Sequence, residues 1–315
     1  MTRTHLHLLW NRKGEWQALF ALCPPDQQDW LAEHLQASPQ LAALPCYVPG
    51  ARAELGKLLP LQLRGQVWCA DDISLRGGFT ERSQLAQLAE GELIYGPAYL
   101  QAGSNQRNHP SQPALMQILA LVVADADTRE LEAAFAQAPS LTVRLLKLVN
   151  SVGIGSRVEI TGIRHAITLL GRRQLQRWLQ LLLYAEQFAD DGEEQALMIG
   201  AALRAKRLEN WAARNWVDHA PDSAFLVGML SLLDRLFGQP LADLLADLPL
   251  QPALRAALLA GEGELGQALA CAAALEAGTA SPLPSASISP RAWLDSELDA
   301  LDWACQLRKQ HAPAE

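Results

Sequence analysis

The spacing of apolar residues changes near residue 105. Before this point the apolar runs are short, and Pro and Gly interrupt them, as at His5–Trp10, Trp16–Cys23 and Glu92–Tyr95. Helix-like windows such as Asp26–Gln36 and Thr80–Ala89 lie between the runs. Short strands that alternate with helices are typical of an α/β unit. The sequence therefore predicts a small α/β domain over residues 1–104.

One tight turn is predicted inside this first part. Asn11-Arg12-Lys13-Gly14 lies between two apolar runs, and Gly14 can adopt a positive φ at little cost. We therefore expect the runs on either side to pair as a hairpin.

After residue 112 nearly every segment has apolar residues three or four positions apart, which favours helices. Residues 105–112 are polar, contain Pro and show no periodicity, so they are predicted to be a linker. An all-helical domain is expected over 113–312, with Asp127 able to cap a first turn and a last helix over Ala292–Arg308. The predicted fold class is α+β.

Composition excludes some classes of protein. The 315 residues carry 26 Lys and Arg against 34 Asp and Glu, a net charge of −8, and half of them are hydrophobic. A chain this apolar can form a core and is not disordered. An acidic chain does not coat nucleic acid non-specifically, so we expect no nucleic-acid partner of that kind.

The cysteines and the hydropathy pattern favour a cytoplasmic protein. Five cysteines occur and none forms a CxxC pair, which argues against a disulfide framework and a zinc ribbon. No apolar run reaches the length of a membrane span, so no membrane contact is expected.

The stretch 138–171 contains two helical apolar faces joined by a Gly-containing loop, with Ser140 placed to cap the first helix and Gly171 to end the second. It resembles the HDOD family, a helical output module of bacterial signalling proteins. The resemblance covers roughly residues 113–310. The segments that carry it are Pro139-Ser140-Leu141, Leu146–Ser151, Ile163–Ile167, Leu169-Leu170-Gly171, Ala224–Gly228 and Leu250-Gln251-Pro252.

The resemblance also bears on catalysis. The HDOD family is related to HD phosphohydrolases, which bind metal through a His-Asp pair, and Ser231 and Leu232 stand where this pair would be. No His-Asp dipeptide occurs anywhere in the chain. Because a metal-activated water needs several fixed ligands, we predict no metal, no cofactor and no enzyme activity.

The first 104 residues show a fainter similarity to EAL phosphodiesterase domains, which accompany one HDOD subtype. Leu8–Phe20 is similar to the first hairpin of that domain, Asp71-Asp72 to its acidic pair, and Gly91–Leu100 to its last strand. An EAL barrel needs on the order of 250 residues, and the glutamate of its first hairpin would fall near Ala18. The resemblance therefore implies a shortened, degenerate EAL remnant.

Positively charged residues are concentrated between Leu141 and Gln180, a segment that contains seven Arg and Lys residues and one Glu. Acidic residues of later helices could neutralise this face, or it could bind an acidic partner, a nucleotide phosphate or a nucleic acid. The candidate interaction surface comprises Asn150, Ser151, Arg164, Arg172, Arg173 and Arg177.

These observations predict a non-enzymatic bacterial signalling protein whose HDOD domain binds one or more partner proteins, with the two domains moving about the linker. A cyclic-dinucleotide or nucleotide sensor is the alternative, using Arg164, Arg172 and Arg173 or the Asp71-Asp72 region. Residual metal-dependent phosphohydrolase activity ranks third.

Overall fold

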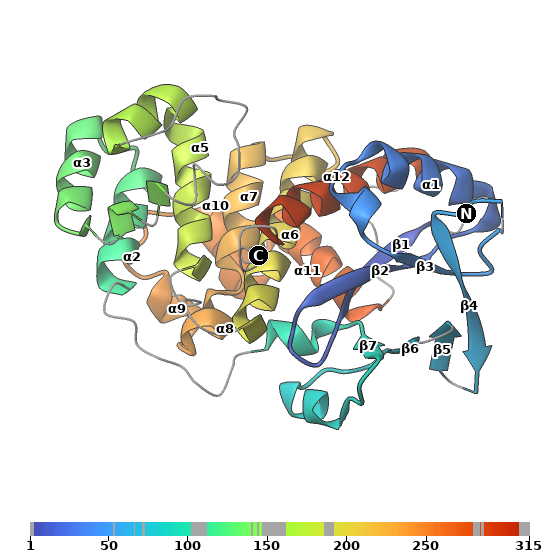
Figure 1. The fold of residues 1–315 in the computed structure, drawn as a ribbon. Helices are drawn as coiled ribbons and strands as arrows, with labels where there is room; N and C mark the ends of the chain where they lie inside the picture. Colours follow the sequence, from blue (N-terminus) through green and yellow to red (C-terminus); the bar gives the residue numbers. More distant parts are fainter. Residues whose placement is uncertain are drawn as a thin grey trace.

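The structure is a computed structural model that describes residues 3–101 apart from 53, 66, 71 and 72, residues 112–146 apart from 140 and 144, and residues 162–185, 192–279, 284 and 287–308. The strands lie at one end of the molecule and the helices α2, α3 and α5 at the other, with α6 and α12 between them (Figure 1).

The first two strands form the predicted hairpin. β1 (His5–Trp10) pairs antiparallel with β2 (Trp16–Leu22). The Asn11 side chain accepts hydrogen bonds from the backbone N–H groups of Lys13 at 2.9 Å and Glu15 at 3.0 Å, and Gly14 has φ 75°. The turn prediction is confirmed.

Seven strands close into a barrel in sequence order, β1 to β7. β2, β3 and β4 run parallel, β5 is antiparallel to both of its neighbours, and β7 runs parallel to β6. A single residue pair, Trp10 with Ile94, joins β7 to β1. The other strands are β3 (Cys46–Pro49), β4 (Leu58–Arg64), β5 (Val67–Ala70), β6 (Ile73–Arg76) and β7 (Glu92–Ile94).

The predicted small α/β domain is therefore wrong, although the α+β class holds. In an open sheet of these seven strands, the outer edges of β1 and β7 would be exposed. Closure of the barrel pairs these two edges with each other. Within the described part of the barrel region, one helix-like window forms the α-helix α1 (Gln28–Ala37), while Thr80–Ala89 contains the 3₁₀ helix η3 (Arg82–Gln87). The remaining 3₁₀ helices are η1 (Pro25–Gln27), η2 (Leu41–Ala43) and η4 (Pro97–Leu100).

The rest of the described chain is helical. Asp127 caps α3, where its side chain accepts the N–H groups of Arg129 and Glu130 as predicted. Gly171, at φ 74°, breaks α5 into two segments where the sequence predicted a helix end. The helices are α2 (Gln112–Val123), α3 (Thr128–Ala136), α5 (Ile163–Ala185), α6 (Gly192–Ala213), α7 (Pro221–Leu230), α8 (Leu233–Phe237), α9 (Leu241–Leu244), α10 (Pro252–Ala260), α11 (Gly263–Ala277) and α12 (Pro290–Arg308).

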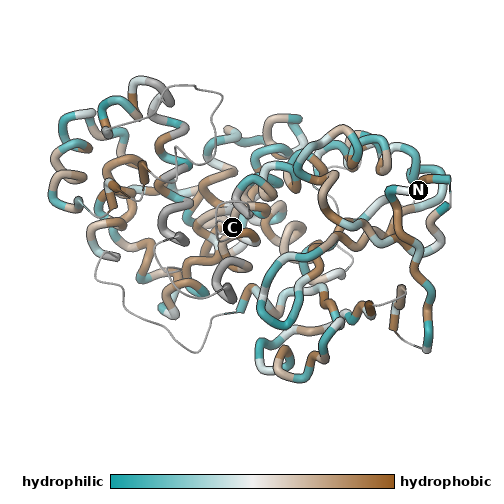
Figure 2. Tube along the Cα trace, in the orientation of Figure 1, coloured by the Kyte–Doolittle hydropathy of each residue, from teal (hydrophilic) through white to brown (hydrophobic). Residues whose placement is uncertain are grey.

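One hydrophobic cluster spans the barrel and the helices. It contains Leu6, Trp16 and Leu19 of the strands, with Leu203 of α6 and Leu298 of α12, all nearly inaccessible to solvent. The brown stretches of Figure 2 run through this centre, while hydrophilic residues gather on the loop around η3 at the bottom of the view. Such shared burial opposes the domain movement that the linker suggested, because separation would expose these side chains to water.

Two glycines mark close helix approaches. A Cβ on Gly228 of α7 would lie 2.3 Å from Cα of Ala205 in α6, and a Cβ on Gly200 of α6 would lie 2.2 Å from Cδ2 of Leu100 in η4. Helix α6 therefore runs against both α7 and the end of the barrel region. Over the described residues, no helix combines the length and hydropathy that a bilayer span requires.

Candidate functional site at the barrel–helix junction

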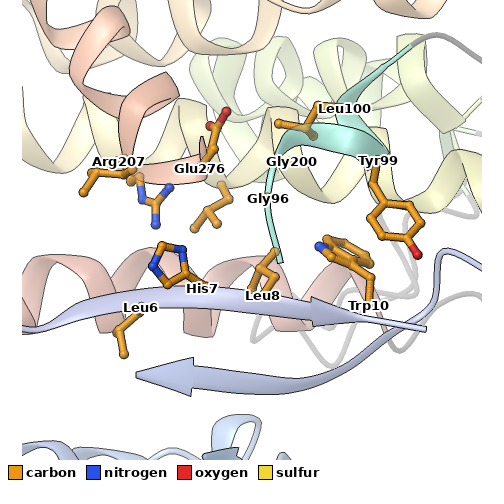
Figure 3. A pocket seen from close by; sticks show the side chains of 12 residues that line it. Leu6, His7, Leu8, Trp10, Gly96, Tyr99, Leu100, Gly200, Arg207 and Glu276 are labelled. Atoms are coloured by element: carbon orange, nitrogen blue, oxygen red, sulfur yellow. The ribbon is translucent and has the colours of Figure 1, made fainter. Parts of the chain in front are cut away.

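A small pocket lies where β1 and η4 meet α6 and α11. Apolar side chains such as Leu6, Leu203 and Leu275 form much of its wall. Three polar groups, His7, Arg207 and Glu276, also line it, and Figure 3 shows the guanidinium of Arg207 pointing towards the His7 ring. Its volume of about 40 Å³ admits a few water molecules, which need such polar partners.

A buried ion pair lies beside this pocket. Arg207 of α6 donates to one carboxylate oxygen of Glu297 in α12, from Nε at 2.9 Å and from Nη2 at 2.8 Å. Both side chains are 2% exposed. Burial raises the pKa of Glu297, an effect that the charge of Arg207 opposes. The pair fixes α12 on α6, because neither charge tolerates burial alone.

A second buried ion pair joins α6 to α11. Arg204 donates from Nε to Glu276 at 2.9 Å and from Nη1 to the Ser231 hydroxyl at 2.9 Å. Ser231 thus holds an arginine at the position where the family resemblance implied a metal-binding histidine. Within the described ranges, no group of three or more His, Cys, Asp and Glu side chains is arranged to hold a metal ion.

His7 is the barrel's contribution to the junction. Its ring lies 5.9 Å from that of Phe20 and 5.1 Å from that of Tyr95 between ring centroids. Burial, followed by the charge of Arg207, lowers the pKa of His7 to about 4. The imidazole is therefore neutral at physiological pH and can both donate and accept a hydrogen bond.

The predicted arginines lie elsewhere, on α5. Arg164 binds Glu132 through two hydrogen bonds of 2.6 Å, Arg173 pairs with Asp222 at 3.1 Å, and Arg177 pairs with Asp222 and with Glu209 of α6. Arg172 also lies on α5. Asn150, Ser151, Asp71 and Asp72, together with the cap at Ser140, fall outside the described residues.

The sequence analysis did not identify the junction residues. Arg204 and Arg207 follow the apolar run Ala196–Leu203 of α6 and are three positions apart, so both lie on one helix face. A charged pair on a buried helix face signals buried partners. Those partners, Glu276 and Glu297, are 72 and 90 residues away in the sequence.

The helical part of the chain is similar to known proteins. Residues 110–248 match the HDOD domain family. The chain is 28% identical over 171 residues to the uncharacterized protein YuxH of Bacillus subtilis, covering 53% of this chain and 42% of YuxH. It is 28% identical over 145 residues to the cyclic di-GMP phosphodiesterase CdgJ of Vibrio cholerae, covering 46% of this chain and 33% of CdgJ.

Each of these matches spans less than half of the relative's length. A crystal structure from Shewanella amazonensis SB2B, whose name assigns it provisionally as a phosphohydrolase, superposes with a TM-score of 0.44 at 15% identity, over 64% of this chain and 93% of that one.

The prediction that the chain is not an enzyme is contradicted by these relatives, since one of them is named a phosphodiesterase. The missing His-Asp pair therefore does not settle whether such a chain is catalytic.

The HDOD match covers the motifs from Pro139 to Gly228 and the helices α5 and α7, while the motif Leu250-Gln251-Pro252 lies beyond its end. Residues 110–248 of this chain are an HDOD domain.

Proposed function

We propose that this chain is a cytoplasmic signal-transduction protein whose HDOD domain binds a partner protein through Arg164, Arg173 and Arg177, here called the arginine face. The observation that carries the proposal is the position of α6. Arg177 of the arginine face pairs with Glu209 at one part of α6, and Gly200 in the same helix lies against Leu100 of η4. One helix therefore contacts both the arginine face and η4 at the end of the barrel region, and we propose that it couples the two.

The arginine face suits an acidic partner. The side chains of Arg164 and Arg173 are 75% and 85% exposed, and each is paired with a carboxylate of its own chain. Exposed ion pairs of this kind contribute little to stability. A carboxylate on a partner can replace Asp222 at Arg173, or replace Glu132 at Arg164 and retain the bidentate geometry that arginine favours.

We further propose that the barrel, within residues 1–104, is a shortened relative of the EAL domain. An antiparallel first hairpin followed by the parallel strands β2, β3 and β4 supports this relation. Ala18, near which the EAL glutamate would fall, is 1% exposed and carries no carboxylate.

The test is a quantitative, nuclease-treated pull-down with the full chain and the double variant Arg164→Glu, Arg173→Glu. The matched control is Arg214→Glu with Arg291→Glu, which also reverses two arginines of surface ion pairs. A protein retained by wild type and control but lost from the test variant is the expected result. Equal loss from both variants, or retention by all three, contradicts the proposal.

A second candidate follows from the similarity to CdgJ, a cyclic di-GMP phosphodiesterase. In this case the chain binds or hydrolyses cyclic di-GMP. Calorimetry with cyclic di-GMP, and assays for its linear product with Mg²⁺ and with Mn²⁺, decide this point. Binding weaker than about 100 μM together with no product rejects it.

A further inference from the structure

A groove opens at the end of the barrel where β2, β3, β6 and β7 begin. Its wall includes Arg12 and Lys13 of the hairpin turn, Pro45 before β3, Ile73 of β6 and Glu90 before β7. Its volume is about 570 Å³, within the range of small-molecule sites. The groove is separate from the arginine face and from the junction pocket, and it shares no lining residue with that pocket.

The helices α6 and α11 lie against the barrel near its seam, which is the place where β1 pairs with β7. One residue pair closes this seam. A Cβ on Gly278, at the end of α11, would lie 3.6 Å from Cε1 of His7 and 3.8 Å from Cε2 of Tyr95. The groove beside the hairpin turn gives a ligand a route to the barrel interior, because Tyr47 and Leu93 line it.

The charge of the groove favours an anion. Neither Arg12 nor Lys13 forms an ion pair with any described residue, and both side chains are exposed. Glu92 is already engaged, since it pairs with Arg76 at 3.5 Å and accepts the N–H of Ala89 at 2.9 Å. Glu90 remains, so the free charges of the described lining sum to +1. Asn11 fixes the turn backbone, which presents both cations from an ordered segment.

The floor of the groove favours a flat ring. Tyr47, 8% exposed, and Leu93 belong to the cluster that fills the barrel interior, and both line the groove. A planar ring can stack on an aromatic side chain while a charged substituent stays near the rim. Glu90, on a different segment from the cations, can accept a hydrogen bond from an amino group.

We propose that this groove binds a nucleoside monophosphate whose base carries an exocyclic amino group. The phosphate lies at Arg12 and Lys13, the base lies over Tyr47, and an exocyclic amino group donates to Glu90. The ligand thus contacts interior residues of the barrel that pack with Phe20, and Phe20 contacts His7 at the junction.

The test is calorimetry of the full chain with 5′-AMP, adenosine and inorganic phosphate as probes. We expect 5′-AMP to bind with a Kd below about 1 mM, and adenosine and inorganic phosphate each to bind at least about tenfold more weakly. Lys13→Glu should weaken 5′-AMP binding by about tenfold. The control Arg64→Glu, an equal charge change on an exposed barrel residue outside the groove, should not weaken it.

A second variant, Ala89→Trp, fills the groove without changing its charge. It alters an exposed side chain, so folding is retained, and it should abolish binding of 5′-AMP. The proposal is overturned if 5′-AMP does not bind at 1 mM, or if Lys13→Glu and Ala89→Trp bind it as tightly as wild type. Either result leaves partner capture by the arginine face unaffected, so the two proposals fail separately.

Discussion

At the scale of single residues, the pair of Arg207 and Glu297 should contribute strongly to stability, because both charges are buried. Both side chains are 2% exposed, and Glu297 keeps one carboxylate oxygen without a hydrogen-bond partner among the described residues. Removing one side chain of the pair leaves the charge of the other buried and unpaired. We expect Arg207→Met to lower the free energy of unfolding by about 3–5 kcal/mol.

Urea unfolding measures this change, and Arg214→Met is its control. Arg214 pairs with Asp299 at 2.5 Å, but both side chains are partly exposed, so its loss should cost less than about 1 kcal/mol. Equal destabilisation by the two variants would show that the Arg207 pair is not a buried ion pair in solution.

His7 makes stability depend on pH. Its pKa is about 4 in the folded chain against an ordinary value of 6.5. Between these values the unfolded chain binds a proton that the folded chain does not, so stability falls as pH drops from 6.5 to 4. The loss attributable to His7 is on the order of 3 kcal/mol. Unfolding free energies of wild type and His7→Leu across this range should diverge by that amount, and parallel curves would contradict the assignment.

At the scale of elements, the crossing of α6 and α7 depends on Gly228. A Cβ at this position meets the backbone of Ala205, which cannot rotate away, whereas a Cβ on Gly200 meets the end of the Leu100 side chain, which can. Gly228→Ala should therefore separate the helices and cost about 1–3 kcal/mol or more. Gly200→Ala should cost less. Thermal unfolding compares the two, and an unchanged midpoint for Gly228→Ala would contradict the close crossing.

At the scale of the whole molecule, the shared cluster should make the barrel and the helices unfold together. Leu298 of α12 is fully buried in the hydrophobic cluster that also contains residues of the strands. We expect Leu298→Ala to cost about 2–5 kcal/mol and to lower the hydrogen-exchange protection of β1 amides and α7 amides by the same amount. The exposed Leu22→Ala serves as control. Loss of protection in α7 alone would show that the two parts unfold independently.

Features set by neighbouring residues could be predicted from the sequence, and features set by distant pairing could not. The Asn11–Gly14 turn, the Asp127 cap, the break at Gly171 and the last helix each follow from a few adjacent side chains. The barrel depends on strand pairs such as Leu19 with Cys46, whose register local patterns do not encode. The junction residues could not be predicted for the same reason, because their ion pairs join residues that are 72 and 90 positions apart in the sequence.

The contact between Thr4, the residue before β1, and α12 has a consequence for how the chain is made. Trp293 of α12 donates from Nε1 to the carbonyl of Thr4 at 3.1 Å, across 289 residues. At a synthesis rate of about 5–20 residues per second, the ribosome delivers α12 roughly 15–60 s after the first strand. During this interval Leu6, Trp10 and Trp16 lack the helices that cover them in the native fold. The nascent chain is therefore most exposed to aggregation at its earliest-made segment, and a holding chaperone would act on that strand pair first.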